Sequence, residues 1–375
     1  MAIVYNEEIK VFNLETEYST YQMKVGEFGF LLHLYYGEKL EADSDLSYLI
    51  QRADRGFSGN PYEARYDRTF SLDYFPQEYS CFGNGDYRAD SIQTIHADGS
   101  NVTDLRYKSH KIYPGKYRLP GLPAMFWKEE EGDSLEITME DPVTGVQVVL
   151  YYGVLEKGDV ITRSVRVMNG GQTPVELKKA MSLCLDMNHN QLDFIHFYGR
   201  HTMERQMERG PLHHGKQSIG SLRGISSHHH NPFVILCDRQ ATEERGDCYG
   251  MMFLYSGNFL AEVEVDQIHQ TRAIMGIHPE QFSFRLEPGE DLALPEVAMI
   301  YTHKGLSCLS LKFHDAIRQH IMRGEWAHKR RPILINNWEA TYFDFNGQKL
   351  VDIARDAKEL GIEMLVMDDG WFGKR

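Results

Sequence analysis

The sequence predicts a mainly β fold, in which a large antiparallel sandwich is followed by one βαβ unit. Three observations support this prediction. First, apolar and polar residues alternate from the start of the chain to about Thr302. Second, turns rich in Gly, Pro and Asn separate the alternating runs. Third, after Thr302 the apolar residues recur at steps of three and four. Many short strands with hardly a helical period among them are typical of a sandwich.

Two patterns define the clearest strands of the sandwich. Residues 177–185 alternate over nine positions, and the apolar runs 135–139 and 146–150 flank the turn sequence Asp141-Pro-Val-Thr-Gly145, which predicts a hairpin. We expect further strands at 21–25, 30–36, 160–167, 233–237, 249–255, 259–265, 281–286 and 296–301.

The C-terminal region has the order helix, strand, helix, strand. Leu306, Leu309, Phe313, Ile317 and Ile321 predict an amphipathic helix over about 305–323, followed by a polar stretch. The apolar runs 333–337 and 362–367 flank a second helical face. That face is made by Leu350, Ile353, Ala354, Ala357 and Leu360, with Asn346 as N-cap and Gly361 as the stop. Continuous apolar runs of this kind are expected of parallel strands covered by helices.

Composition excludes several classes of protein. The 375 residues carry 40 basic and 54 acidic side chains, a net charge of −14, which argues against a nucleic-acid surface. The N-terminal sequence MAIVYNEEIK has no secretory signal, and no apolar stretch reaches the ~18–20 residues of a membrane span. The five cysteines are scattered without metal-ligand spacing, so we expect buried or unreactive thiols in a reducing cytoplasm.

The residues that suggest chemistry stand at the ends of the two parallel strands. Asn336-Asn337-Trp338 ends the first, and Asp368-Asp369-Gly370-Trp371-Phe372 ends the second, where α/β barrels build their active sites. Carboxylates that accept hydroxyl protons beside an aromatic ring suit a sugar. The alternative is a plain turn after a buried strand. Successive strand residues point to opposite faces, so Asp368 and Asp369 fit binding roles better than a catalytic pair.

Several motifs, in the same order, resemble the bacterial, tetrameric α-galactosidases of glycoside hydrolase family 36. The two segments at the start of the barrel are RPILINNWEATYFDFN (331–346) and VMDDGWFGKR (366–375). The earlier ones are ADRGFSGNPYE (53–63), YDRTFSLD (66–73), PQEYSCFGNGDYR (76–88), TDLRYKSHKIY (103–113), RGISSHHHNPF (223–233) and YSGNFLAEVEVDQ (255–267).

The resemblance implies a fold and an activity. It implies an N-terminal β-supersandwich over 1–302, a helical connector over 303–330 and, over 331–375, the start of a (β/α)8 barrel, incomplete here. The implied activity is retaining hydrolysis of terminal α-galactosyl units from oligosaccharides such as melibiose and raffinose, without a cofactor. The nucleophile and the acid/base are expected after Arg375, so residues 1–375 alone are expected to be inactive.

The resemblance also implies binding roles and a partner. The positions of Asp368 and Asp369 bind galactose hydroxyls, and Trp338 helps to wall the pocket. Those of Asp54 and Arg68 reach a neighbouring subunit's site in a homotetramer. Many relatives have Trp at the position of His201, which lies at the same subunit boundary, and this departure leaves the role of His201 open.

Alternative interpretations remain for these residues and for the chain. Asp54-Arg55-Gly56 is also compatible with a salt-bridged turn, and Arg68 with a pair to Asp67 or Asp73. His228-His229-His230 suggests a metal, but consecutive residues lack the spacing that metal ligands need, so we predict a solvated loop and no metal site. A non-catalytic carbohydrate-binding or assembly module, an α-N-acetylgalactosaminidase and a galactosyltransferase are the alternative functions.

Overall fold

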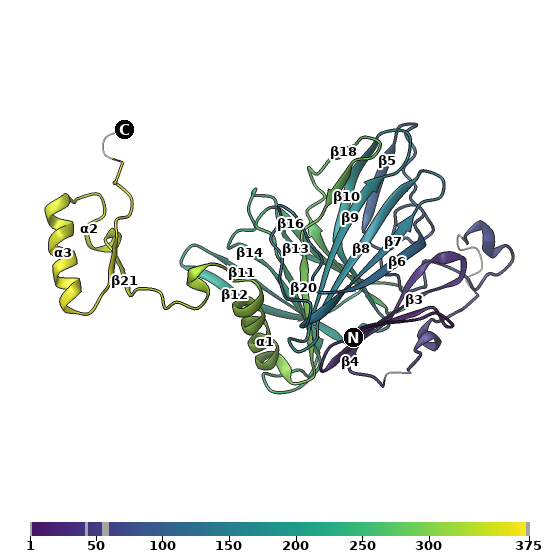
Figure 1. The fold of residues 1–375 in the computed structure, drawn as a ribbon, viewed down its shortest axis with the longest axis horizontal. Coiled ribbons are helices and arrows are strands. Elements are labelled where there is room, and N and C mark those ends of the chain that lie inside the picture. The colour runs from purple at the N-terminus through teal and green to yellow at the C-terminus, as the bar shows by residue number, and fades with distance from the viewer. Residues whose placement is uncertain (1, 42–43, 55–59, 373–375) are drawn as a thin grey trace. The chain divides into compact units, whose positions relative to one another are not determined.

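The computed structural model describes residues 2–41, 44–54 and 60–372, and the chain divides into two compact units, Met1–Ile321 and Met322–Arg375 (Figure 1). Within the described residues, the first unit contains three antiparallel sheets and the second a two-stranded parallel sheet. The predicted mainly β class is confirmed. No helix among the described residues is both long and apolar enough to cross a membrane.

The largest sheet of the first unit has the order β12-β11-β14-β15-β20-β9-β8-β7-β6, with β19 paired to β9. Its strands are β6 (Arg106–Pro114), β7 (Gly132–Glu140), β8 (Val146–Leu155), β9 (Val160–Asn169), β11 (Leu192–Arg200), β12 (Met203–Pro211), β14 (His230–Asp238), β15 (Cys248–Phe253), β19 (Asp291–Ala293) and β20 (Val297–Thr302). Figure 1 labels most of these strands, from β6 in blue to β20 in green.

A second sheet of the same unit has the order β13-β16-β17-β10-β18, with β5 paired to β10. Its strands are β5 (Ile92–His96), β10 (Val175–Met187), β13 (Gly215–Ser221), β16 (Phe259–Val265), β17 (Thr271–Ile277) and β18 (Phe284–Leu286). The third sheet has the order β1 (Ile3–Asn6), β2 (Val11–Glu15), β3 (Ser19–Val25) and β4 (Leu31–Glu38). The short 3-10 turns are η1 (Glu27–Gly29), η2 (Ser47–Leu49), η3 (Tyr62–Ala64) and η4 (Glu325–Ala327).

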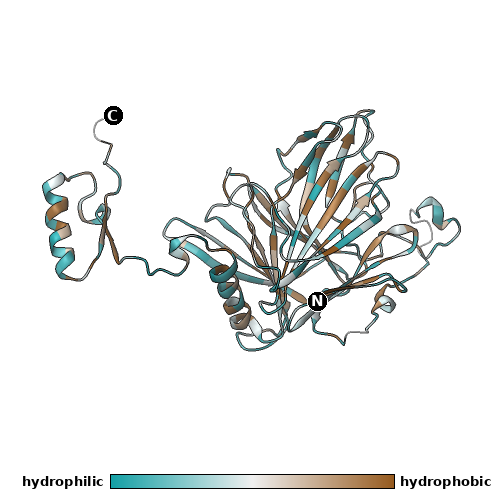
Figure 2. Cartoon of the chain, viewed as in Figure 1, coloured by the Kyte–Doolittle hydropathy of each residue, from teal (hydrophilic) through white to brown (hydrophobic). Residues whose placement is uncertain are grey.

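The hydrophobic core of this unit draws on all three sheets, because their inward side chains form one buried cluster that includes Leu14, Val165 and Leu183. Alternation along the strands is visible as brown and teal bands in Figure 2. The predicted strand 177–185 lies within β10, and the predicted hairpin is β7–β8. At its turn the Asp141 carboxylate accepts hydrogen bonds from the backbone N–H groups of Val143 (2.9 Å) and Thr144 (3.1 Å).

Helix α1 (Gly305–His320) confirms the helix predicted over 305–323, although it ends earlier. It packs on β15 and β20 through the buried side chains of Leu309 and Phe313. Its first N–H groups, those of Leu306 and Ser307, donate to the backbone carbonyls of Thr242 (3.0 Å) and Glu243 (3.0 Å), since they have no partner within the helix.

The second unit contains β21 (Leu334–Asn336), α2 (Trp338–Thr341), α3 (Gly347–Glu359) and β22 (Met364–Val366). The strands pair in parallel, so the predicted βαβ unit is confirmed, while α2 was not predicted. The Asn346 side chain caps α3 by accepting from the Lys349 N–H (3.0 Å), and Gly361 follows the helix with φ +82°, both as predicted.

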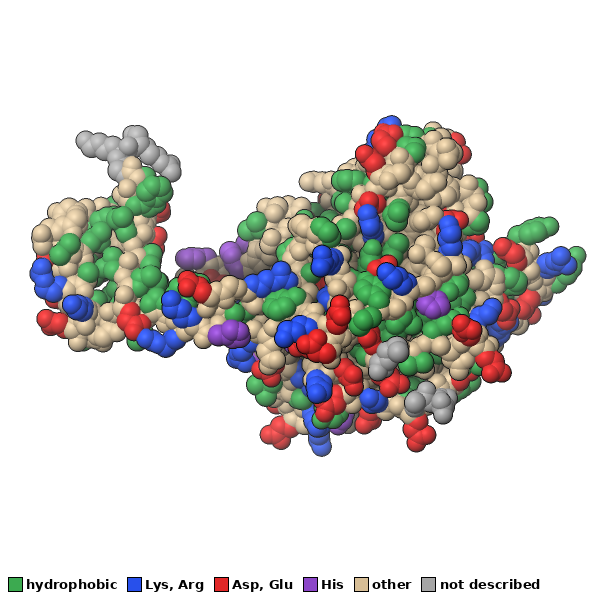
Figure 3. Space-filling model, in the orientation of Figure 1, with side chains coloured by type: hydrophobic (Ala, Val, Ile, Leu, Met, Phe, Trp, Pro, Cys, Tyr) green, Lys and Arg blue, Asp and Glu red, His purple; other side chains and the backbone are tan. Residues whose placement is uncertain are grey.

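The two strands of the second unit are partly exposed, although continuous apolar runs are typical of parallel strands covered by helices. Leu334 and Met364 are 49% and 40% exposed. Figure 3 shows hydrophobic side chains on the surface of this unit. Within the described residues the sheet has only two strands, so neither its edges nor its open face has the neighbours that a complete barrel supplies.

Candidate functional site

Asp368 and Asp369 stand two and three residues after the end of β22, beside the end of β21. The Asp368 carboxylate accepts a hydrogen bond from the Asn336 side-chain amide (2.6 Å) through Oδ2 and from the Asp369 backbone N–H (2.8 Å) through Oδ1. The parallel register of the strands brings Asn336 opposite Val366 and therefore places these polar groups at one edge. The Asp368 carboxylate is thus held by two protein donors.

The Asp369 carboxylate differs from that of Asp368. It is exposed, and within the described residues no protein group donates a hydrogen bond to it. An ionised carboxylate has two oxygens and accepts hydrogen bonds only, so this side chain is available to hydroxyl groups of a ligand.

Asn337, which the sequence singled out only within Asn336-Asn337-Trp338, has a positioning role that sequence reasoning did not assign. Its side chain is fully buried, its Oδ1 accepts from the Asp368 N–H (2.8 Å), and its Nδ2 donates to the hydroxyl of Thr341 (2.9 Å). Its backbone N–H donates to the Val366 carbonyl (3.3 Å). Asn337 therefore connects the two strand ends, and its place directly after an apolar run was the only signal available.

Trp338 begins α2 and heads a group of aromatic rings. The Tyr342 ring lies 5.3 Å from the Trp338 ring and the Phe343 ring 5.0 Å from it, both nearly perpendicular to it. The backbone N–H of Trp338 donates to the Asn336 Oδ1 (2.7 Å), which fixes the position of Trp338 at the end of the strand. Trp371 is 69% exposed. The structure therefore brings Trp338, Asp368 and Asp369 to the same end of the parallel strands.

In the first unit, Asp54 and Arg68 contact each other. The Arg68 Nη2 lies 2.9 Å from the Asp54 Oδ1, and the two side chains are 57% and 59% exposed. The alternative pairing of Arg68 with Asp67 is not what the structure shows, because Asp67 pairs with Arg52 (3.3 Å). The interpretation of Asp54-Arg55-Gly56 as a turn falls partly outside the described residues.

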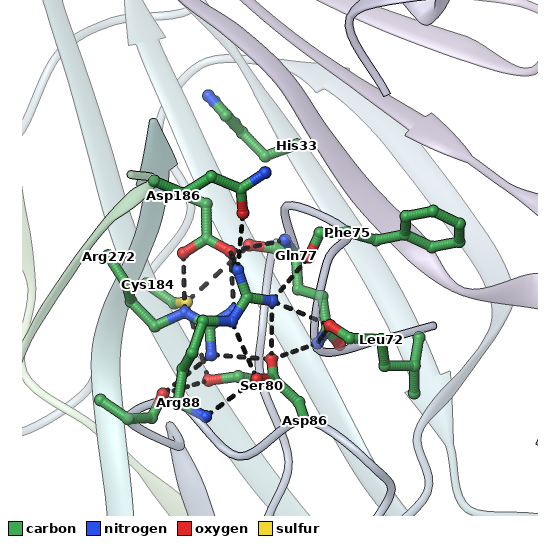
Figure 4. Close-up of polar contacts among 12 residues, drawn as sticks. His33, Leu72, Phe75, Gln77, Ser80, Asp86, Arg88, Cys184, Asp186 and Arg272 are labelled. Carbon is green, nitrogen blue, oxygen red and sulfur yellow. Dashed lines mark hydrogen bonds and ion pairs between the residues drawn. The ribbon is translucent and has the colours of Figure 1, made fainter. Parts of the chain in front are cut away.

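The chain after Arg68 is anchored to the sandwich by a buried cluster of two arginines and two aspartates (Figure 4). The Arg88 guanidinium donates to the carbonyls of Leu72 (2.8 Å) and Phe75 (2.8 Å) and to the Asp86 carboxylate (2.9 Å). Arg272, on β17, binds Asp186 through two bonds of 2.7 Å and lies 2.8 Å from Asp86. These contacts hold the segment 72–88 against β10 and β17.

Electrostatics favour the charged forms of Asp86 and Arg88. Burial alone would raise the pKa of Asp86, but the guanidinium groups of Arg272 and Arg88 lower it to about 2. Burial likewise opposes the charge of Arg88, whereas the carboxylates of Asp86 and Asp186 raise its pKa above the usual value. The charges are therefore mutually compensated inside the protein.

His201 lies away from the Asp54–Arg68 pair. It stands at the exposed turn between β11 and β12, and β12 is one edge of the largest sheet. The loop with Asp54 and Arg68 lies beside the other edge, β6, because Arg106 of that strand is 3.7 Å from Glu63. The structure does not bring His201 together with that pair within this unit.

The histidine run 228–230 shows no arrangement of ligands. The rings of His228 and His229 stack on each other at 4.5 Å. In the part of the chain that the structure describes, no group of three or more His, Cys, Asp or Glu side chains is placed to hold a metal ion.

The chain matches two family models and several known proteins. Residues 29–287 match the glycosyl hydrolase family 36 N-terminal domain, and residues 292–375 match melibiase. The chain is 52% identical over its full length to the bifunctional α-galactosidase/sucrose kinase AgaSK of Mediterraneibacter gnavus and 47% identical to the α-galactosidase AgaA of Geobacillus stearothermophilus. It covers 40% and 51% of those proteins, about half their length or less.

Solved structures agree with these matches. The galactosidase domain of AgaSK superposes on the whole chain with a TM-score of 0.97, and AgaB of Geobacillus stearothermophilus does so with 0.95, at 52% and 48% identity. The chain covers 52% and 51% of those two structures. A sandwich followed by a βαβ unit with polar strand ends, together with these matches, places the chain in a glycoside hydrolase family. The chain belongs to glycosyl hydrolase family 36, which confirms the resemblance inferred from its motifs.

Proposed function

We propose that residues 1–375 form the sandwich and the first barrel repeat of a retaining α-galactosidase, which hydrolyses terminal α-galactosyl units of oligosaccharides such as melibiose and raffinose. The observation that carries the proposal is similarity to α-galactosidases over the full length of the chain. Structures of AgaA variants with raffinose and with stachyose, to which the chain is 47% identical, add support for this substrate class.

In this proposal the strand ends of the second unit bind galactose. The Asp369 carboxylate accepts hydrogen bonds from sugar hydroxyls. Asp368, oriented by Asn336, offers its remaining lone pairs to the same ring, and Trp338 walls the pocket. The nucleophile and the acid/base belong to later barrel strands, because two adjacent aspartates cannot flank a scissile bond with the ~5–5.5 Å separation of a retaining pair.

We further propose a cytoplasmic homotetramer with three parts in each subunit, over 1–302, 303–330 and 331–375. Asp54 and Arg68 serve a neighbour's pocket, and His201 lies at the same subunit boundary. What supports this is the exposure of the Asp54–Arg68 pair and of the turn with His201, which leaves all three side chains accessible to another subunit.

Asp369→Asn in the full-length enzyme tests the binding role. One charged hydrogen bond contributes about 1.5–3 kcal/mol, so kcat/KM for an aryl α-galactoside should fall by about 10- to 160-fold. Asp352→Asn is the matched control, because Asp352 is an exposed carboxylate on α3 whose contacts are to Gln348 and Arg355 of the same helix.

Each outcome of this test has a defined meaning. Wild-type kcat/KM for Asp369→Asn would contradict the binding role, and an equal loss in Asp352→Asn would show that the effect is not specific to the strand end. A full-length protein that binds α-galactosides without hydrolysing them would favour a non-catalytic module instead. A preference for α-N-acetylgalactosaminides, or transfer in place of hydrolysis, would favour the other activities of the family.

A further inference from the structure

Two cysteines stand directly opposite each other on neighbouring strands of the largest sheet. Cys237 is the penultimate residue of β14, Cys248 is the first of β15, and their Cα atoms are register partners. Side chains of opposed residues in an antiparallel pair lie on the same face of the sheet. Both side chains are buried, and both thiols are free.

The backbone hydrogen-bond pattern shows that Cys237 and Cys248 form the type of antiparallel pair with the shorter Cα separation. The backbone N–H of Asp238 donates to the carbonyl of Asp247 (2.9 Å), so these two residues occupy a hydrogen-bonded position. Hydrogen-bonded and non-hydrogen-bonded pairs alternate along an antiparallel ladder, so Cys237 and Cys248 occupy a non-hydrogen-bonded position. At such positions the Cα atoms are about 4.5 Å apart and the side chains are closest.

The other side of β14 gives the same assignment independently. The Leu212 N–H donates to the Leu192 carbonyl (3.0 Å), so Leu192 directs its backbone polar groups toward β12. The next residue, Asp193, therefore directs its backbone N–H and C=O toward its register partner Cys237 on β14. The backbone N–H and C=O of Cys237 thus pair with β11 and not with β15. Disulfides need Cα separations of about 4.4–6.8 Å, so a bridge to Cys248 requires no shift of the strands.

The two thiols differ in acidity. A hydrogen bond with the Cys248 thiol lowers the pKa of Cys237 against the opposing effect of burial, and the Arg209 guanidinium lowers it further. The same hydrogen bond, together with burial, raises the pKa of Cys248. The pair therefore combines a sulfur that ionises more readily with one that keeps its proton, which is the division between an attacking and a resolving cysteine.

We propose that Cys237 and Cys248 form a redox modification site whose reactant is hydrogen peroxide. The Cys237 thiolate attacks one peroxide oxygen, the O–O bond breaks, and hydroxide leaves, so Cys237 becomes a sulfenic acid. The Cys248 sulfur then attacks the Cys237 sulfur, and the S–O bond breaks as the S–S bond forms. The thiol proton leaves with the departing hydroxide as water. Two thiols are oxidised and the peroxide is reduced to water.

The sequence-based expectation was of buried or unreactive thiols, and Cys237 and Cys248 are buried; this proposal adds a reaction between them. The turn between the two cysteines also supplies the carbonyls of Thr242 and Glu243 that cap α1. A bridge at the base of the turn therefore fixes the support of this helix. Because both sulfurs are buried, a small oxidant such as peroxide is the appropriate reagent.

Peptide mapping after peroxide treatment tests the site. The purified protein is treated with hydrogen peroxide, quenched, denatured, alkylated with N-ethylmaleimide and digested with trypsin, which separates the cysteines because Arg239 and Arg245 lie between them. We expect a cross-linked pair of the peptides 224–239 and 246–272, lighter by two hydrogens and split by dithiothreitol. Cys81 and Cys184, which have no opposed cysteine, should remain fully alkylated.

Variants define the order of events. Cys248→Ser should leave Cys237 as a sulfenic acid that dimedone captures, Cys237→Ser should abolish the dimedone adduct and the cross-link, and Cys308→Ser should change neither. If the half-buried Cys308 is oxidised in the wild-type protein while Cys237 and Cys248 stay fully alkylated, the proposal is overturned. That measurement needs no substitution, so it decides the question even if a variant fails to fold.

Discussion

Replacing Asp86 with asparagine tests whether the buried arginine–aspartate cluster stabilises the sandwich and the chain after Arg68. The Asp86 side chain is 1% exposed, and it lies 2.9 Å from Arg88 and 2.8 Å from Arg272. Removing its charge leaves two buried guanidinium groups with one carboxylate fewer. Breaking such a pair costs about 3–5 kcal/mol, and because Asp186 still compensates Arg272 we expect about 3 kcal/mol at pH 7.

The same residue predicts a pH dependence. The pKa of Asp86 is about 2 in the folded protein against 3.8 for a free aspartate. The difference corresponds to about 2 kcal/mol of stability. Because the folded pKa is the lower one, this contribution is fully present above pH 3.8 and is lost as the pH falls through about 2. About half of it is already lost at pH 3, so the difference between wild type and Asp86→Asn should narrow by about 1 kcal/mol between pH 7 and pH 3.

Urea unfolding at pH 7 and pH 3, followed by circular dichroism, measures both effects. Asp315→Asn is the control, since its pair with Arg318 is exposed on α1 and should contribute less than about 1 kcal/mol at either pH. If the free energy of unfolding of Asp86→Asn at pH 7 lies within about 1 kcal/mol of the wild-type value, the cluster does not stabilise the protein as expected. A difference that does not change with pH would refute the assigned pKa.

Three further predictions concern the proposed enzyme. Asp368→Asn in the full-length protein should lower kcat/KM on p-nitrophenyl α-galactoside by at least about 10-fold, and an unchanged value would contradict its role. Arg68→Ala should change the free energy of unfolding by less than about 1 kcal/mol, because its pair with Asp54 is exposed, yet it should reduce the activity of the assembled enzyme. A protein that light scattering shows to be a monomer and that is fully active would argue against shared sites. Residues 1–375 expressed alone should show no turnover, since one βαβ unit is far short of a barrel of ~250 residues, and turnover near the full-length rate would place the catalytic carboxylates within this chain.

Elements with a local signal were predictable from the sequence. Side-chain bonds to neighbouring N–H groups mark the Asp141 turn and the Asn346 cap, and both act within a few residues. The edge strand β12 (Met203–Pro211) was missed because it is largely polar and exposed, and its pairing with β11 depends on backbone groups that every sequence has. Positions 281–283 were wrongly assigned to a strand, since Gln281 has φ +65° and β18 begins at Phe284.

The burial of charged side chains could not be predicted from the sequence. Glu78 is fully buried, where its carboxylate accepts from the hydroxyls of Tyr21 (2.8 Å) and Tyr152 (2.6 Å) and lies 3.2 Å from Arg163. These three partners come from three different strands, β3, β8 and β9. Alternation assigns a charged residue to the surface, and only the three-dimensional pairing makes its burial tolerable.

The strand-end site was predictable in its residue types but not in its internal division of labour. Asp368 and Asp369 are chemically identical and adjacent, yet the structure gives two protein donors to the first and, within the described residues, none to the second. A hydroxyl that binds Asp369 displaces only water, whereas one that moves Asp368 must disturb its bonds to Asn336 and to the backbone. Under the proposed function, Asp369 therefore supplies the adaptable contact and Asp368 the fixed reference for the sugar ring. Asn336→Ala frees Asp368 and removes the acceptor of the Trp338 backbone N–H but leaves both carboxylates in place, so it should raise the KM for an aryl α-galactoside less than Asp369→Asn does.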